Sequence, residues 1–208
     1  MTTMTGPTTT SDRSSRTDRS FPAATGGAFA VLVVVGNGIY TEGGGATLGY
    51  AVELLGYVAL AVFVSWIALS FDAVHRGATM LAVVGGATML AVKLGGWTAA
   101  RASLEESLAA EVSAGLAQVD EVAFVLGWLP YGLLMIGLSL AAGRAGRLPR
   151  PMVWVGIAAG LGCVLAVPVS TSEPFVLPWL FSLLWLIAAS ILLARGRRRG
   201  DREWSVEV

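Results

Sequence analysis

Six long apolar runs, each close to the length of a membrane-crossing helix, dominate this sequence. They cover residues 23–40, 46–70, 78–100, 122–142, 152–170 and 175–194. The hydrocarbon core of a bilayer is about 30 Å thick, and about 20 residues of helix cross it. Backbone polar groups must be satisfied within lipid, and the runs lack the period-two alternation of barrel strands. We therefore expect an all-α polytopic membrane protein with six transmembrane helices.

The composition agrees with this expectation. Hydrophobic residues make up 55% of the 208 and charged residues only 13%, and the mean hydropathy is +0.70. A soluble domain needs a more polar surface than this. We expect one transmembrane domain over residues 23–194, after a disordered tail over 1–22 that is rich in Thr, Ser and Arg. We interpret the first run as a retained helix, because it lacks a convincing cleavage site, although removal as a signal peptide is the alternative.

The basic residues lie on one side of the expected topology. Twelve of the 14 Lys and Arg residues fall before the first run, between alternate runs or after the last run. By the positive-inside rule, we expect both termini to be cytoplasmic. The tail over 195–208 carries Arg195, Arg197, Arg198 and Arg199. These residues fix topology and could also bind anionic lipid headgroups.

The segment from Arg101 to Glu121 is long enough to have structure outside the membrane. Ser103 with Glu106 three residues later is a candidate capping box, which predicts that a short amphipathic helix begins there. Asp120 is a candidate N-cap for the following membrane helix. The outer surface is acidic, and it could cover the bundle, attract cations or dock an extracytoplasmic partner.

Most catalytic and metal-binding patterns are missing. The single histidine, His75, falls in a loop, and the single cysteine, Cys163, falls inside an apolar run. Pairs or clusters of such residues would be needed for haem, zinc or disulfide chemistry. The many glycine pairs lie inside apolar runs, so none of them forms a phosphate-binding loop. We therefore expect no enzymatic activity, no cofactor, no metal and no nucleic-acid partner.

One acidic and one basic residue lie within the apolar runs of the first half. Glu53 and Lys93 each lie seven residues from the outer end of their run, which is about 10 Å of helix. The loop between these runs is short, so the two helices should be antiparallel neighbours. Equal depth on adjacent helices predicts an ion pair. The phenol of Tyr50 or Tyr57 could complete its hydrogen bonding.

Three interpretations of this pair remain open. It could fix the register of the two helices, or Lys93 could extend to the outer interface while Glu53 faces water. The third interpretation is that the pair gates or relays a proton or cation, as ionisable groups inside membranes often do. The second half of the chain has no charged residue within its apolar runs. This asymmetry favours a structural role over the inverted repeats of many transporters.

Glycine and proline mark the packing of the second half. Gly156 and Gly160 form a GxxxG pattern, which permits close approach of another helix within the bundle or across a homodimer. Pro130 and Pro178 should kink their helices or lie in their first turns, because proline lacks a backbone donor.

Three apolar motifs carry a resemblance to a known group of proteins. They are AFVLGWLPYGLLM at 123–135, GRLPRPMVWVGI at 146–157 and SLLWLIAASILL at 182–193. In these motifs the chain resembles a family of uncharacterised actinobacterial multi-pass membrane proteins. The resemblance covers the second half well and the first half only in outline. It implies six membrane helices in a bacterial plasma membrane and supplies no activity.

The sequence thus favours a non-enzymatic plasma-membrane protein with a structural or accessory role, as a homo-oligomer or as a subunit of a membrane complex. The alternative is a small proton- or cation-coupled transporter or channel that uses Glu53 and Lys93. A cavity that reaches both charged groups would favour the alternative, and a dry, directly bonded pair would favour the structural role.

Overall fold

The computed structural model describes residues 21–41, 46–71, 76–105, 107–167 and 176–203, and all of its regular structure there is helical. The side chains of 40, 41, 46, 176 and 196–203 lie outside this description, as do residues 1–20 of the predicted disordered tail. The helices are α2 (Phe21–Thr41), α3 (Ala46–Phe71), α4 (Arg76–Ser103), α5 (Ala110–Leu126), α6 (Trp128–Arg144), α7 (Arg150–Ala166) and α8 (Val176–Glu203). The prediction of an all-α chain is confirmed.

Five segments of the described chain are long and apolar enough to cross a membrane. They are Phe21–Ile39, Thr47–Phe71, Arg76–Ser103, Ala110–Arg144 and Leu177–Arg195. The fourth segment joins α5 to α6, so the predicted run 122–142 is divided between two helices. The apolar helix α7 is shorter, with 17 residues. The helices are therefore compatible with a membrane-embedded protein that has five or six spans.

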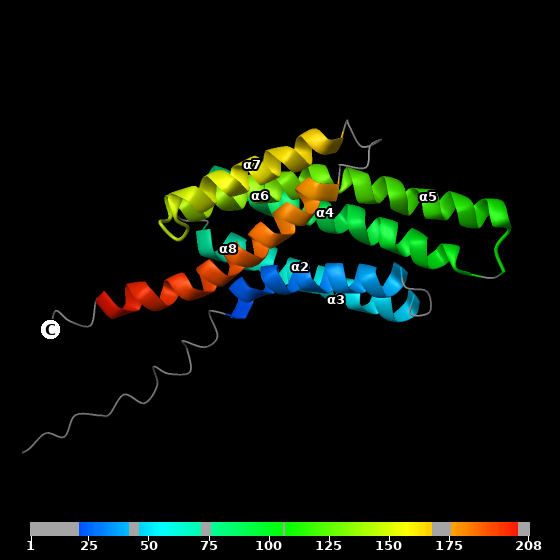
Figure 1. Ribbon diagram of the computed structural model, residues 1–208, viewed down its shortest axis with the longest axis horizontal. Coiled ribbons are helices and arrows are strands. Elements are labelled where there is room, and N and C mark those ends of the chain that lie inside the picture. Colours follow the sequence, from blue (N-terminus) through cyan, green and yellow to red (C-terminus); the bar gives the residue numbers. More distant parts are fainter. Residues whose placement is uncertain (1–20, 42–45, 72–75, 106, 168–175, 204–208) are drawn as a thin grey trace, which may run out of the picture.

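The helices form a closed ring around a packed interior. Neighbours pack in the order α2, α3, α4, α6, α7 and α8, and α8 returns to α2. α5 packs beside the second half of α4, and Figure 1 shows both of them reaching past the ends of α2 and α3. The interior is filled by side chains of α6, including Tyr131, Leu134 and Leu138, all at most 1% exposed. Since α6 contacts α3, α5 and α8 as well as α4 and α7, it is the most enclosed helix of the ring.

Glycine permits the closest helix contacts. A Cβ atom added at Gly85 of α4 would lie 2.6 Å from the carbonyl oxygen of Pro130. Gly132 of α6 and Gly160 of α7 lie against each other's backbone in the same way, and Gly156 lies against Ser139 and Trp185. Both glycines of the GxxxG pattern are buried, so the pattern packs inside the bundle.

The connection from α4 to α6 differs from the prediction. Ser103 ends α4, and its hydroxyl donates a hydrogen bond of 2.7 Å to the carbonyl oxygen of Ala100. Its predicted role as the N-cap of a new helix is therefore wrong; Glu106, the other half of the predicted capping box, lies outside the described residues. α5 begins at Ala110 instead and extends past the predicted outer segment to Leu126.

Asp120 lies in the interior of α5, so its predicted role as an N-cap is also wrong. The reason is that α5 and α6 are almost continuous. The backbone N–H of Gly127 donates to the carbonyl of Ala123 at 3.0 Å, and that of Tyr131 donates to the carbonyl of Gly127 at 3.2 Å. No helix start is needed near Asp120. Pro130 then falls in the first turn of α6. A backbone N–H is not needed there for the hydrogen bonds within α6, so the proline costs little stability.

Candidate functional site: a polar cavity between α3, α4 and α5

Three charged side chains from three helices line one cavity of about 80 Å³. Glu53 comes from α3, Lys93 from α4 and Asp120 from α5. The remaining lining residues are polar or aromatic, namely Asn37, Tyr50, Tyr57, Trp97 and Phe124. A cavity needs roughly 10–15 Å³ of such volume to hold one water molecule. The cavity therefore has room for several waters or for a small hydrated cation.

Tyr57 holds the carboxylate of Glu53. The phenol O–H donates a hydrogen bond of 2.5 Å to Oε1 of Glu53 across one turn of α3. Tyr57 is buried, at 4% exposure, and its ring packs near that of Phe29. A helical spacing of four residues places the two side chains on the same face. Because the phenol is fixed by packing, it also fixes the direction of the carboxylate.

Lys93 shares the cavity with both carboxylates, and among the described residues no ion pair joins it to either one. Its ammonium nitrogen is 3.9 Å from the centroid of the Phe124 ring, an arrangement that stabilises a cation. Glu53 and Asp120 both act on Lys93 through space. Gly127 allows this position, because a Cβ atom there would lie 3.0 Å from Cε of Lys93. The ammonium is thus held by an aromatic face and by two nearby negative charges.

Tyr50 and Trp97 join α3 to α4 beside the charged groups. The indole N–H of Trp97 donates to the backbone carbonyl of Tyr50 at 3.2 Å. The two rings meet edge to face, with their centroids 6.0 Å apart. This contact fixes the register of α3 against α4, so Glu53 and Lys93 stay at the same depth.

Two further glycines bring backbone close to the acidic groups. A Cβ atom added at Gly36 of α2 would lie 2.9 Å from the backbone nitrogen of Glu53. One added at Gly96 of α4 would lie 3.0 Å from Oδ1 of Asp120. Small residues at these points let α2 and α5 approach the site closely enough to enclose it.

The structure brings together the residues that the sequence singled out and adds others. Glu53 and Lys93 share the cavity, and Tyr57 supplies the expected hydrogen bond, whereas Tyr50 packs on Trp97. The predicted direct contact between Glu53 and Lys93 is replaced by an interaction across the cavity. Asp120 as a second carboxylate was missed, because the sequence placed it at a helix end.

A signal for Asp120 was nevertheless present in the sequence. Asp120, Phe124 and Gly127 are spaced by four and then three residues, so they share one helical face. That face is polar, aromatic and small, which suits contact with a lysine on a neighbouring helix.

The arrangement can bind a positive charge or take up a proton. Two carboxylates and one ammonium leave a net negative charge when all three groups are ionised, and a low local dielectric strengthens their interactions. Among the described residues, no group of three or more His, Cys, Asp or Glu side chains is placed to hold a metal ion. Comparison with family models, curated proteins and solved structures finds no match to this chain.

Proposed function

We propose that the protein is a small proton- or cation-coupled transporter or channel of a bacterial plasma membrane. The cavity shared by Glu53, Lys93 and Asp120 carries this proposal. Charges that serve only to lock two helices together are expected to be directly bonded and dry, because separated buried charges are costly. Here the charges surround space for water or a cation.

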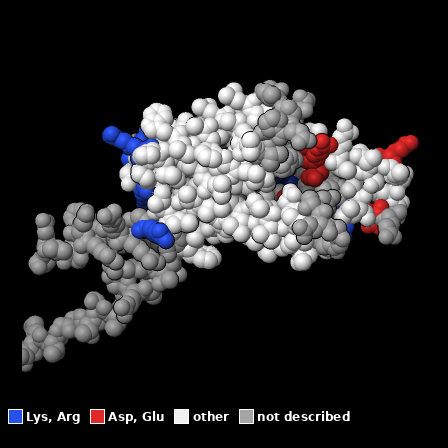
Figure 2. Space-filling view, viewed as in Figure 1, with Lys and Arg blue, Asp and Glu red and all other residues white. Residues whose placement is uncertain are grey.

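The distribution of charge supports a defined orientation with six spans. Figure 2 shows basic side chains gathered at one end of the bundle and acidic ones at the other. Arg76, Arg144 and Arg150 begin or end helices at the basic end. By the positive-inside rule this end faces the cytoplasm, as do both chain termini. The polar cavity then lies toward the acidic outer face, where cations would collect.

A structural or accessory role is the second candidate, and internal contacts favour it. Glu53 has Tyr57 as a hydrogen-bond donor, and Lys93 has the ring of Phe124. A subunit that holds a larger complex together could use the same contacts to fix the register of α3, α4 and α5. Under this role the cavity would hold fixed water and would pass no ion.

An ion-flux measurement separates the two candidates. We expect liposomes with the purified full-length protein to pass protons or a monovalent cation faster than empty ones. Glu53→Gln should lower the rate by about tenfold or more, because the amide cannot exchange a proton. The hydrogen bond from Tyr57 is retained in this variant. Asp120→Asn should lower the rate in the same direction.

Glu111→Gln is the matched control, because Glu111 is exposed on α5 outside the cavity. Its flux should equal that of the unchanged protein. The transport proposal fails if no cation passes above the background of empty liposomes, or if Glu53→Gln and Glu111→Gln behave alike. The structural role would be favoured if no cation flux is measured and Glu53→Gln lowers the stability of the bundle.

A further inference from the structure

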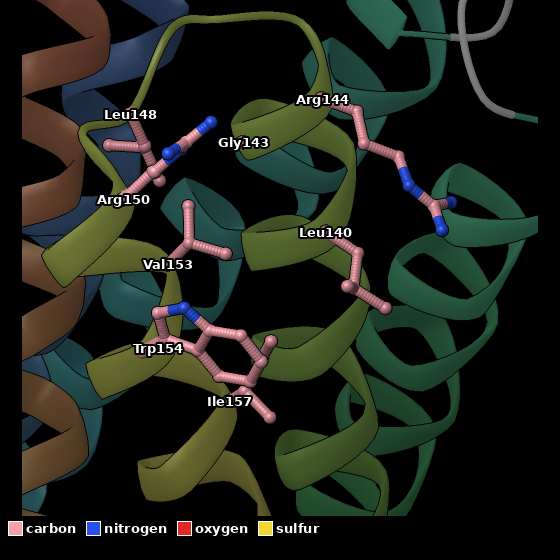
Figure 3. Close-up of a pocket in the computed structure, with 8 residues that line it drawn as sticks. All are labelled: Leu140, Gly143, Arg144, Leu148, Arg150, Val153, Trp154 and Ile157. Carbon is pink, nitrogen blue, oxygen red and sulfur yellow. The ribbon is translucent and has the colours of Figure 1, made fainter.

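A second cavity, of about 240 Å³, lies between α6 and α7 at the basic end of the bundle. Its lining is mainly apolar, with an arginine from each helix, and consists of Leu140, Gly143, Arg144, Leu148, Arg150, Val153, Trp154 and Ile157. Figure 3 shows the groove between the end of α6 and the start of α7, beneath the loop that connects them. We call it the α6–α7 groove. It shares no residue with the polar cavity.

The loop above the groove has a fixed geometry. Gly146 adopts a φ of 66°, a left-handed conformation that favours glycine. The N–H of Arg147 donates to the carbonyl of Ala142 at 2.9 Å, and the N–H of Gly146 donates to that of Gly143 at 3.0 Å. These two bonds form a Schellman motif, which ends α6 tightly. The loop therefore holds Arg144 and Arg150 at the rim of the same groove.

The two rim arginines are available to a ligand. Both are exposed, and among the described residues neither guanidinium has a carboxylate partner. Arg147 differs, since its guanidinium lies over the ring of Phe71 at 4.9 Å, away from the groove. In Figure 3 the Arg150 side chain lies at the loop end of the groove, whereas the Arg144 side chain points away from Arg150, on the side of α6 opposite to α7. Arg144 is exposed and lines the groove, so its long side chain can turn to reach a group that Arg150 holds.

The floor of the groove is suited to hydrocarbon. Trp154 is 70% exposed, and Figure 3 shows its indole lying across the gap toward α6. It lies four residues beyond Arg150, which is about 6 Å deeper along α7. Tryptophan is enriched at this depth of a membrane, just inside the headgroups. Leu140, Val153 and Ile157 continue the apolar surface below the rim.

We propose that the α6–α7 groove binds one anionic phospholipid. Its phosphodiester lies between Arg144 and Arg150, and one acyl chain lies over Trp154 and Ile157. Guanidinium groups match phosphate oxygens in charge and geometry. Basic pockets between membrane helices on the cytoplasmic side are suited to such headgroups. A free phosphate would gain nothing from the apolar floor, which is why the lipid is the occupant. The site is independent of the transport proposal.

Bromine-labelled lipids can test this site, because bromine quenches nearby tryptophan. The full-length protein is placed in phosphatidylcholine nanodiscs that contain brominated phosphatidylglycerol or brominated phosphatidylcholine. The tryptophan emission that is lost on the substitution Trp154→Phe comes from the groove. Its quenching therefore measures which lipid lies there. We expect phosphatidylglycerol to be preferred by about thirtyfold, as two basic residues near an anionic headgroup predict. Arg144→Gln/Arg150→Gln should reduce this preference to about twofold or less.

Arg76→Gln/Arg101→Gln is the matched control, since it removes two exposed arginines that do not line the groove. This control variant should keep the preference for phosphatidylglycerol over phosphatidylcholine. Quenching by brominated phosphatidylcholine in every variant verifies that the protein is folded and inserted. The proposal is overturned if both brominated lipids quench equally in the unchanged protein, or if the control loses as much preference as the groove variant. It is also overturned if millimolar inorganic phosphate displaces the lipid.

Discussion

Replacing Lys93 with Met should destabilise the bundle by about 3 kcal/mol. The substitution keeps an unbranched side chain of similar length but removes the one positive charge among the residues that line the polar cavity. Glu53 and Asp120 would then face each other without compensation. Loss of one partner from a buried charge pair costs about 3–5 kcal/mol. We expect the lower end of that range, because Glu53 keeps its bond from Tyr57 and neither carboxylate touches Lys93 directly. Unfolding of detergent-solubilised protein by SDS, followed by tryptophan fluorescence, measures the change.

Two further variants identify the cause. Arg101→Met removes an exposed positive charge from the last turn of the same helix and should change stability by less than about 0.5 kcal/mol. Glu53→Gln/Lys93→Met should be more stable than Lys93→Met alone, because only Asp120 remains charged. If Lys93→Met is as stable as Arg101→Met, the three groups are not electrostatically coupled.

Gly85→Ala should destabilise the contact between α4 and α6 by about 1–3 kcal/mol. The added Cβ would lie 2.6 Å from both the carbonyl oxygen of Pro130 and the backbone nitrogen of Leu134. Both are backbone atoms, so relief requires α4 and α6 to separate. The same SDS titration reports the loss of stability.

Gly95→Ala is the matched control on the same helix. Nothing lies within 4 Å of a Cβ atom at Gly95. The change should be neutral, or stabilising by up to about 1 kcal/mol, because alanine has the higher helix propensity. A loss of stability in Gly85→Ala together with no loss in Gly95→Ala would support the packing of α4 on α6. Equal effects would contradict it.

The positions of the long helices follow from the sequence for a simple reason. Lipid demands a continuous apolar helix, so the runs 23–40, 46–70 and 78–100 each fall within one helix of the structure. The approach of Glu53 and Lys93 could also be predicted, because a short loop makes α3 and α4 antiparallel and equal residue counts give equal depth. Neither inference needs a long-range contact.

The remaining features depend on contacts between distant segments. α8 closes the ring on α2, and this contact between the last and the first helix does not follow from chain order. The capping signal at Ser103 was misleading because α4 extends as far as that residue, and the next helix begins only at Ala110. Asp120 was misplaced for a related reason, since α5 continues almost without a break into α6. Local patterns could not show that these helices extend and pair beyond the apolar runs.

The central claim is that Glu53 and Asp120 line a hydrated cavity that exchanges protons or cations with the outside. Infrared difference spectroscopy of the reconstituted protein tests it most directly, because carboxyl and carboxylate stretching bands shift with deuteration, protonation and cation binding. We expect bands that change when the outer pH or monovalent cation is changed, and that exchange rapidly in D₂O. Part of this signal should be missing in Glu53→Gln and another part in Asp120→Asn. Carboxyl bands that are identical under all conditions, and unaltered in both variants, would contradict the claim.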